Sequence, residues 1–553
     1  HWVKDNPELE ELMRSLSDEE IRTIKRGGHD YKKIFAAFQK AAKPNGRPSV
    51  ILMKTIKGYG MGHAGEGKNT THQKKNMNPE ERIEAARRFG IPLSEEEAAK
   101  AKFYRPADNS PEMQYMRKQR EALGGYLPER RDESVTLKTP DDALFEEFYA
   151  GTDGREVSTT MVLVRIIAKL LKQEGIKEYI VPIIPDEART FGMDGLFRHA
   201  GIYQPKGQLY KPVDTGSVSY YRESTDGQIL QEGICEAGAL ASFMAAGSAY
   251  AMHGLPMIPF YIFYSIFGFQ RVGDMIWACG DMMCKGFLIG GTSGRTTLNG
   301  EGVQHQDGHS HVLSSIVPNM KSYDPTFAFE LATIVKDGIH RMYEKGENIF
   351  YYITVTNENY AMPLMPENVA EGILKGMYRY QKSGKAASKG RKAHLMGSGS
   401  IMMQVLEARQ MLEDMNISTD VWSVTSYTEL QRDALDAERE GLLANNGQKR
   451  KCYVETLLEK EKGVFVSASD YVKSLGMSIA KWMPKQYHVL GTDGYGFSEA
   501  RNDLRDHFEI SAKYIALSAL QMLREEGAVT DKEVSDFLKS YKINSKKVNP
   551  ATL

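Results

Sequence analysis

The sequence predicts an α/β protein made of successive doubly wound, mostly parallel sheets, with a smaller α/β domain at its carboxyl end. Short apolar runs typical of fully buried parallel strands alternate with helix-length segments along most of the chain. The 553 residues are enough for three or four domains, each with its own core. Hydrophobic residues make up 41% and charged residues 26%, which excludes a disordered or fibrous chain.

The first 127 residues predict mainly helices, with one strand and one glycine-rich loop. Two capping boxes, Ser17-x-x-Glu20 and Ser94-x-x-Glu97, each mark the start of a helix. The expected elements are a short helix after residue 17, a helix over 31–42, a strand over 49–55, a glycine-rich loop over 57–68 and charged helical sequence over 78–123. The charged, irregular sequence over 128–154 predicts a linker.

The rest of the chain predicts two blocks of strands joined by helices. The first block has expected strands over 179–185, 257–264, 286–291, 319–323 and 349–355, and expected helices over 158–173, 237–252, 268–283 and 326–343. A second linker over 365–391 leads to the smaller block, with strands over 393–397, 420–425, 463–468 and 486–490 and two closing helices. Helices of this length between strands favour right-handed crossovers in parallel sheets.

Charge and cysteine content narrow the functional classes. Lys plus Arg (71) nearly equals Asp plus Glu (72), so we expect neither nucleic acid nor an anionic membrane as a partner. Four cysteines are too few for a disulfide framework, and none forms a C-x-x-C pair. Cys235, Cys279 and Cys284 lie in apolar stretches that predict buried, reduced thiols. Without a recognisable secretory signal at residue 1, we expect a cytoplasmic protein.

One long uncharged segment needs a specific interpretation. Ala237 to Gln270 contain no Asp, Glu, Lys or Arg, but His253, Pro256 and Pro259 interrupt the segment. A membrane span needs about 20 uninterrupted apolar residues. We therefore interpret the segment as a buried helix, a turn and a buried strand.

Ligands of open α/β sheets bind at the carboxyl ends of strands, and this rule selects the candidate sites. The places to examine are Lys57 with its glycine-rich loop, Asp186-Glu187, 264–269, the loop over 290–311, and 491–497.

The first loop resembles a phosphate-binding P-loop only in part. Gly62-x-x-x-x-Gly67-Lys68 is followed by Asn69, so the hydroxyl that would hold Mg²⁺ is missing. Residues 70–76 are polar and irregular, whereas a P-loop continues into a helix. We favour a glycine-hinged active-site loop that carries His72.

The loop over 290–311 ends in His305-x-x-x-His309-x-His311, with Asp307 among them. Imidazoles at this spacing can ligate zinc. The preceding glycines instead favour a backbone that approaches a small molecule, with the histidines as proton donors or anion binders. Local hydrogen bonding of these histidines is the third interpretation.

Glu236 begins an otherwise apolar helix. A carboxylate that enters a core must be protonated or hydrogen-bonded, because an unpaired buried charge costs several kcal/mol. Glu236 is either a paired structural carboxylate or a group of raised pKa that shares a proton with a ligand nitrogen.

Several long motifs resemble one family, in the same order and from end to end of the chain. The motifs are Thr55-Ile-Lys-Gly-Tyr-Gly60, Gly67 to Gln73, Asp186 to Gly192, Gln228 to Gly238, Pro259 to Tyr264, Gly290 to His311 and Gly491 to Arg501. They are similar to the homodimeric-type decarboxylase component of the pyruvate dehydrogenase complex. The resemblance implies transketolase-like architecture, a homodimer, and thiamine diphosphate with Mg²⁺ as cofactors. It also implies pyruvate as substrate and transfer of an acetyl group to the lipoyl domain of the dihydrolipoyl acetyltransferase core.

The resemblance also implies roles for individual residues. Glu236 matches the carboxyl group that bonds the cofactor's pyrimidine ring, and Phe267 matches the aromatic residue packed on that ring. Tyr264 and His305 match positions near the reacting carbon, and His72 matches the loop histidine linked to acetyl transfer. Lys57 and Glu187 match further active-site positions, and Asp186 matches a cofactor-binding position.

One departure from the family pattern is large. The Gly-Asp-Gly motif followed by Asn, which holds Mg²⁺ and the diphosphate in such enzymes, does not occur here, so we expect no metal ligand in this chain. We expect residues 1–135 to be the final part of the diphosphate-binding domain, with an active-site loop near 57–76. Residues 136–365 should form the pyrimidine-binding domain, and residues 366–553 the transketolase-like carboxyl-terminal domain. On this interpretation the chain lacks its beginning and is inactive alone.

Other function classes stay open at this point. They are another transketolase-like enzyme, such as a 2-oxoglutarate decarboxylase or a ketol transferase, a zinc hydrolase or P-loop protein, and a non-catalytic interaction module.

Overall fold

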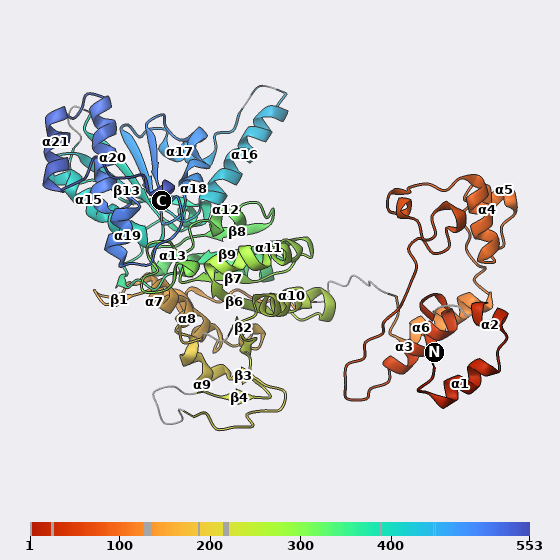
Figure 1. Ribbon diagram of the computed structural model, residues 1–553. Helices are drawn as coiled ribbons and strands as arrows, with labels where there is room; N and C mark the ends of the chain where they lie inside the picture. The colour runs from red at the N-terminus through yellow and green to blue at the C-terminus, as the bar shows by residue number, and fades with distance from the viewer. Residues whose placement is uncertain are drawn as a thin grey trace. The chain divides into compact units, whose positions relative to one another are not determined.

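The computed structural model describes residues 3–23, 27–126, 134–185, 188–213, 221–386, 390–445, 447 and 449–553. The chain divides into two compact units, residues 1–129 and residues 130–553 (Figure 1). We describe each unit by itself.

The described part of the first unit is helical. Its α-helices are α1 (Pro7–Arg14), α2 (Asp18–Thr23), α3 (Tyr31–Ala41), α4 (Pro79–Arg88), α5 (Glu95–Ala99) and α6 (Pro111–Ala122). Both predicted capping boxes are confirmed: the Glu20 carboxylate accepts from the Ser17 backbone at 2.8 Å, and Ser94 caps α5 reciprocally with Glu97. The strand predicted over 49–55 is wrong, because these described residues form no ladder and Leu52 is 92% exposed. An apolar run without a neighbouring strand cannot satisfy its backbone as a sheet.

The first unit buries very little apolar surface. Among its described residues, the buried hydrophobic side chains are only Ala64, Ala86 and Ala98. Helix α3 instead exposes Tyr31, Phe35 and Phe38, whose spacing places them on one face. Such a surface needs a covering partner, since monomeric domains rarely leave large apolar patches open.

The second unit begins with a six-stranded parallel sheet of order β5-β2-β6-β7-β9-β8. Its strands are β5 (Leu230–Gln231), β2 (Ile180–Ile184), β6 (Ile258–Tyr264), β7 (Phe287–Gly291), β9 (Phe350–Thr354) and β8 (Met320–Tyr323). Helices α8 (Thr159–Leu170), α10 (Glu236–His253), α11 (Ser265–Asp281) and α13 (Ala328–Ile339) flank it, with α12 (Ser310–Ser314) before β8 (Figure 1). Every strand expected here is present, shifted by one or two residues at most.

A five-stranded sheet of order β11-β13-β12-β14-β15 forms the carboxyl-terminal part. Its strands are β11 (Met377–Gln381), β13 (Ser418–Val424), β12 (Lys392–Gly397), β14 (Val464–Ala468) and β15 (Tyr487–Leu490), and its helices include α15 (Met402–Asp414), α16 (Tyr427–Leu443) and α20 (Ala512–Glu525). Only β11 pairs antiparallel with its neighbour. The two-sheet α/β architecture predicted from the sequence is therefore confirmed.

Both predicted linkers contain ordered elements. The stretch over 128–154 includes α7 (Asp142–Tyr149), which buries Phe145 and Phe148, and the stretch over 365–391 includes α14 (Ala370–Lys375) and β11. We predicted linkers because these stretches are rich in charged residues. Their apolar side chains nevertheless occur at helical or alternating spacing and face the core.

Helix α10 is less buried than its uncharged sequence predicts. Ala239, Leu240, Phe243, Gly247 and Ala249 are buried against β6 and α11, but Ala237, Ala241, Ala245 and Met252 are exposed. Cys235, the N-cap residue of this helix, is also exposed, whereas the other three cysteines are buried and all four are free. Among the described residues, no helix combines the length and the apolar character needed to cross a bilayer.

Candidate active site

Three of the predicted site residues form an aromatic cluster at the carboxyl end of β6. Tyr264 is the last residue of β6, Phe267 lies in the first turn of α11, and His305 ends a short 3₁₀ helix over Val303–His305. The ring centroids of Tyr264 and His305 are 4.6 Å apart, and those of Phe267 and His305 are 5.4 Å apart. Phe191 adds a fourth ring, 5.4 Å from Tyr264. These side chains therefore lie at a strand end, where the strand-end rule predicts a ligand site.

Glu236 lies at the first position of α10, and its side chain is only 13% exposed. Its carboxylate accepts a hydrogen bond of 2.6 Å from the Arg271 guanidinium. The same guanidinium lies over the Phe267 ring, 3.8 Å from its centroid. Arg271 therefore connects the carboxylate of α10 to the aromatic cluster by a charge-assisted hydrogen bond and a cation–π contact.

The sequence contained a signal for Arg271 that we did not use. Glu236 and Arg271 flank the uncharged segment from Ala237 to Gln270, and they are the charges that meet when this segment folds back through β6. Arg271 also lies one helical turn after Phe267, at the spacing that places both side chains on one face. Glu232, one turn before Glu236, is exposed and accepts a hydrogen bond from the Ser242 hydroxyl.

His305 combines a partly buried ring with an unused nitrogen. Its side chain is 22% exposed, and its Nδ1 atom is buried without a hydrogen-bond partner among the described residues. The Glu301 carboxylate lies 3.7 Å from this atom, beyond hydrogen-bond distance. The ring is thus available to a ligand that enters beside Tyr264 and Phe267.

The loop that carries His305 is anchored by the carboxyl-terminal sheet. The buried Asp470 carboxylate accepts from the backbone amides of Thr296 at 2.8 Å and Thr297 at 2.9 Å. Thr292, buried at the end of β7, has φ +47°, an uncommon conformation for a β-branched residue. The glycine-rich part of this loop therefore packs mainly between two sheets, and its later part reaches the aromatic cluster.

The three histidines of this loop do not form a metal site. His309 Nε2 lies 2.9 Å from Gln270 Nε2, and the buried His311 Nε2 lies 2.8 Å from the Thr354 hydroxyl. Burial lowers the pKa of His311 to about 4, so its ring is neutral. Among the described residues, only His394, Asp420 and Glu461 could hold a metal ion as a group of three.

That group is already neutralised by basic side chains. Lys392 Nζ lies 2.6 Å from the Asp420 carboxylate, and the Arg379 guanidinium contacts Glu461. His394 Nδ1 accepts a hydrogen bond from the Trp422 indole at 3.2 Å. Because these basic side chains already balance the carboxylates, we assign no metal to the group.

The remaining predicted residues lie elsewhere. Lys57 and His72 are both exposed in the first unit, on a loop that the Gly67 amide closes by donating to the Lys57 carbonyl at 2.9 Å. Among the described residues, neither a strand before this loop nor an α-helix directly after it is present, so the P-loop interpretation is wrong. Asp186 and Glu187 lie outside the described residues.

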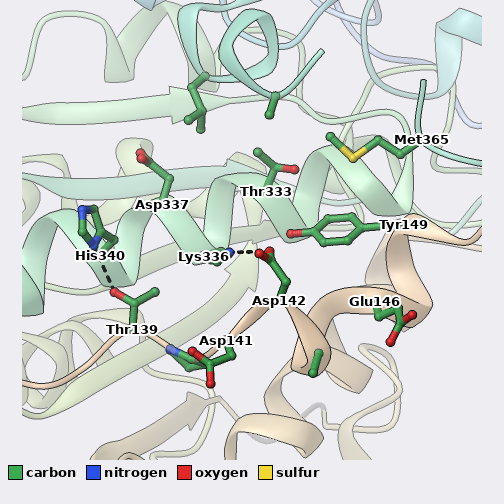
Figure 2. Close-up of a pocket in the computed structure, with 14 residues that line it drawn as sticks. Thr139, Asp141, Asp142, Glu146, Tyr149, Thr333, Lys336, Asp337, His340 and Met365 are labelled. Carbon is green, nitrogen blue, oxygen red and sulfur yellow. Dashed lines mark hydrogen bonds and ion pairs between the residues drawn. The ribbon is translucent and has the colours of Figure 1, made fainter. Parts of the chain in front are cut away.

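A separate cavity of about 1130 Å³ lies between α7 and α13 (Figure 2). Asp141, Asp142, Glu146 and Asp337 contribute carboxylates to it, and Lys336 pairs with Asp142 at 2.5 Å. It contains none of the residues that the sequence selected. The aromatic cluster with Glu236 and Arg271 is therefore the candidate active site.

Comparison with known proteins shows which proteins the chain resembles. Residues 136–363 match the pyruvate dehydrogenase E1 component middle domain, and residues 376–511 match the transketolase-like C-terminal domain. Along its whole length, the chain is similar to pyruvate dehydrogenase E1 components, and it spans 62% of the length of the two relatives described next. It is 48% identical over 552 residues to the pyruvate dehydrogenase E1 component of Pseudomonas aeruginosa, and 48% identical over 558 residues to that of Escherichia coli K12. Each comparison covers 100% of this chain and 62% of the relative.

Solved structures support the same architecture. The transketolase of Campylobacter jejuni matches with a TM-score of 0.58 at 17% identity, covering 88% of this chain and 65% of that one. The transketolase of Leishmania mexicana matches with a TM-score of 0.59 at 13% identity, covering 91% of this chain and 66% of that one. The transketolase-like fold expected from the sequence is confirmed.

Proposed function

We propose that this chain takes part in the thiamine diphosphate-dependent oxidative decarboxylation of pyruvate and passes the acetyl group to a lipoyl group of the dihydrolipoyl acetyltransferase component. The observation that carries the proposal is the placement of a largely buried Glu236 carboxylate next to the aromatic cluster of Tyr264, Phe267 and His305. Similarity to pyruvate dehydrogenase E1 components supports the same reaction. A zinc hydrolase is not supported, because His305, His309 and His311 belong to separate networks.

The residues present fit the pyrimidine half of thiamine diphosphate. When bound, this cofactor stabilises the electron pair released as carbon dioxide leaves a 2-oxo acid. The Glu236 carboxylate would hold a proton at a ring nitrogen, and the Phe267 ring would pack on the pyrimidine. The unpartnered His305 Nδ1 and the Tyr264 hydroxyl would orient the pyruvate and move protons, which contributes about 10²–10⁴ in rate.

We propose roles in the same reaction for four further residues. His72 assists transfer to the lipoyl group, and Lys57 neutralises charge on the substrate or cofactor. Strand β2 ends at Ile184, at the same edge of the sheet as Tyr264, and Asp186 and Glu187 come two and three residues later in the sequence, which favours cofactor contact. Mg²⁺ would accompany the diphosphate, and none of the described residues that we assign supplies a ligand for it.

The surface of α10 supports a homodimer. Its exposed residues Ala237, Ala241, Ala245 and Met252 form an uncharged face on a helix that begins at Glu236. Uncharged exposed faces of this kind are typical of interfaces between subunits. We also propose a cytoplasmic location, to which the four free cysteines are suited.

The division into domains remains our proposal. The match to the middle-domain family over 136–363 supports a pyrimidine-binding domain over 136–365, and the match over 376–511 supports a carboxyl-terminal domain over 366–553. The first 135 residues would complete the diphosphate-binding side, which agrees with their many exposed apolar side chains.

Substitution of Glu236 tests the function directly. In the enzyme that contains this chain, we expect Glu236→Ala to abolish pyruvate decarboxylation, measured as pyruvate-dependent carbon dioxide release with thiamine diphosphate and Mg²⁺. The matched control is Glu232→Ala, which removes an exposed carboxylate one turn away and should leave activity nearly unchanged. Circular dichroism should show the same fold for both variants. Turnover retained by Glu236→Ala would disprove the assigned role.

A further inference from the structure

A small closed cavity lies where the carboxyl ends of the two sheets meet. Its volume is about 10 Å³, which is room for one water-sized species. Asp324 reaches it from the end of β8, Ser398 from the end of β12, and Tyr427 from the start of α16. None of these residues belongs to the candidate active site.

Asp324 enters this cavity without a basic partner. Its carboxylate accepts hydrogen bonds from the Thr354 hydroxyl at 2.7 Å and the Tyr471 hydroxyl at 3.3 Å. It forms no ion pair with any described Lys or Arg, and the nearby Asp470 adds a second negative charge. Burial raises the pKa of Asp324 to about 7. A buried carboxylate in this position lacks the compensation that buried charges require.

Two buried hydroxyl groups that line the cavity are also unsatisfied. Ser398 is 2% exposed and Tyr427 is 4% exposed. Ser398 interacts with the Asp324 carboxylate and Tyr427 with Ser467, but neither hydroxyl makes a hydrogen bond of acceptable geometry among the described residues. Buried polar atoms without a partner are rare, and each one indicates an unseen water or ion. His311, which also lines the cavity, already pairs through Nε2 with Thr354 and does not compensate the charge.

We propose that this cavity is a binding site for a single dehydrated monovalent cation, held by the Asp324 carboxylate and the hydroxyl oxygens of Ser398 and Tyr427. A hard cation prefers oxygen ligands of this kind, and its charge neutralises Asp324. Mg²⁺ fits poorly, because it keeps several waters in an octahedral shell and the cavity has room for one species. The cation links the six-stranded sheet to the carboxyl-terminal sheet.

The first experiment locates the ion. Crystals of the full chain grown in choline chloride are soaked in rubidium chloride, and anomalous diffraction is recorded at the rubidium edge. We expect a peak in the cavity between Asp324, Ser398 and Tyr427. A cavity that holds only water in both crystals, with no anomalous peak, would overturn the proposal.

The second experiment measures the linkage between cation and stability at pH 8, where Asp324 is ionised. Potassium chloride replaces choline chloride at constant ionic strength. At ten times the dissociation constant we expect the melting temperature to rise by about 1–2 °C, and above it to rise further with the logarithm of the potassium concentration. Asp324→Asn should lose this rise, and the milder Tyr427→Phe should need at least tenfold more potassium for the same rise. Asp337→Asn is the control, because the Asp337 carboxylate lies outside the cavity and accepts a hydrogen bond from Tyr351. This variant should keep the rise in melting temperature. If potassium raised the melting temperature equally in all three variants, the proposed cation site would be wrong.

Discussion

Arg271 is the residue on which the geometry of the candidate site depends most. It holds the Glu236 carboxylate at 2.6 Å and covers the Phe267 ring at 3.8 Å, so one side chain positions both proposed cofactor contacts. The sequence selected Glu236, Phe267, Tyr264 and His305, and the structure places the last three in one aromatic cluster to which Arg271 connects Glu236; their roles stay predictions. Arg271 was not predicted: it and Glu236 flank the uncharged segment over 237–270, but only the tertiary fold shows that these two charges pair.

We expect Arg271→Ala to lower decarboxylation activity about 10–100-fold, the equivalent of one charge-assisted hydrogen bond of about 1.5–3 kcal/mol. Arg271→Lys should recover only part of the lost activity, because a lysine ammonium cannot stack on the Phe267 ring as the planar guanidinium does. Arg165→Ala is the control, because Arg165 pairs with Glu147 at 2.9 Å on the surface of α8. Steady-state kinetics with pyruvate would measure the three variants, and full activity of Arg271→Ala would exclude a positioning role.

Asp324 and His311 make the free energy of unfolding depend on pH in opposite directions. The pKa of Asp324 is raised from 3.8 to about 7, so the folded chain keeps a proton that the unfolded chain has lost, and stability falls as pH rises from about 4 to 7. The pKa of His311 is lowered from 6.5 to about 4, so stability falls as pH drops from about 6.5 to 4. The two effects oppose each other over most of this range.

The substitution Asp324→Asn removes one of these two effects. In choline buffer, we expect its stability relative to the unsubstituted chain to rise between pH 5 and pH 7, by at most about 1.4 kcal/mol per pH unit, and to level off above pH 7. Urea unfolding at a series of pH values would measure this difference. A relative stability that is independent of pH would show that Asp324 is ionised throughout.

At the scale of elements, the sequence predicted buried parallel strands best. Strands β2, β6, β7 and β9 are continuous apolar runs, and such runs are buried on both faces. Strand β11 was missed because it is an antiparallel edge strand with polar residues. Helix α10 was predicted to be buried because it lacks charge, but part of it is exposed, since an uncharged exposed face can have the same composition as a core.

The exposed face of α10 leads to a test of the proposed homodimer. We expect Ala241→Glu to place a charge in the interface and to shift the protein from dimer to monomer. The control Ala143→Glu adds the same charge to an exposed position of α7. Sedimentation velocity would compare the two variants with the unsubstituted protein. If Ala241→Glu has the same oligomeric state as Ala143→Glu, α10 does not form the interface.

At the scale of the whole molecule, the apolar core is very unevenly distributed. The buried hydrophobic side chains belong almost entirely to the second unit, whereas the described part of the first contributes three alanines. The sequence did not reveal this difference, because the apolar residues of the first unit occur at helical spacing. Spacing predicts which face of a helix is apolar, but it does not identify what covers that face.

This distribution predicts how the chain unfolds. We expect residues 134–553 alone to unfold cooperatively, with a melting temperature within a few degrees of that of the whole chain. Residues 1–129 alone should show no cooperative transition, since they bury too little apolar surface to offset chain entropy. Differential scanning calorimetry of the two fragments would measure both. A sharp heat-absorption peak from residues 1–129 would contradict the prediction.

The anchoring of the His305 loop by Asp470 also has an evolutionary consequence. The amides of Thr296 and Thr297 and the carboxylate of Asp470 come from opposite sides of the boundary between the two sheet domains. A chimera that joins the first domain of this chain to the last domain of a distant relative would keep its active site only if both parents share this contact. Recombination at the boundary is therefore constrained, and the two domains are expected to be inherited together.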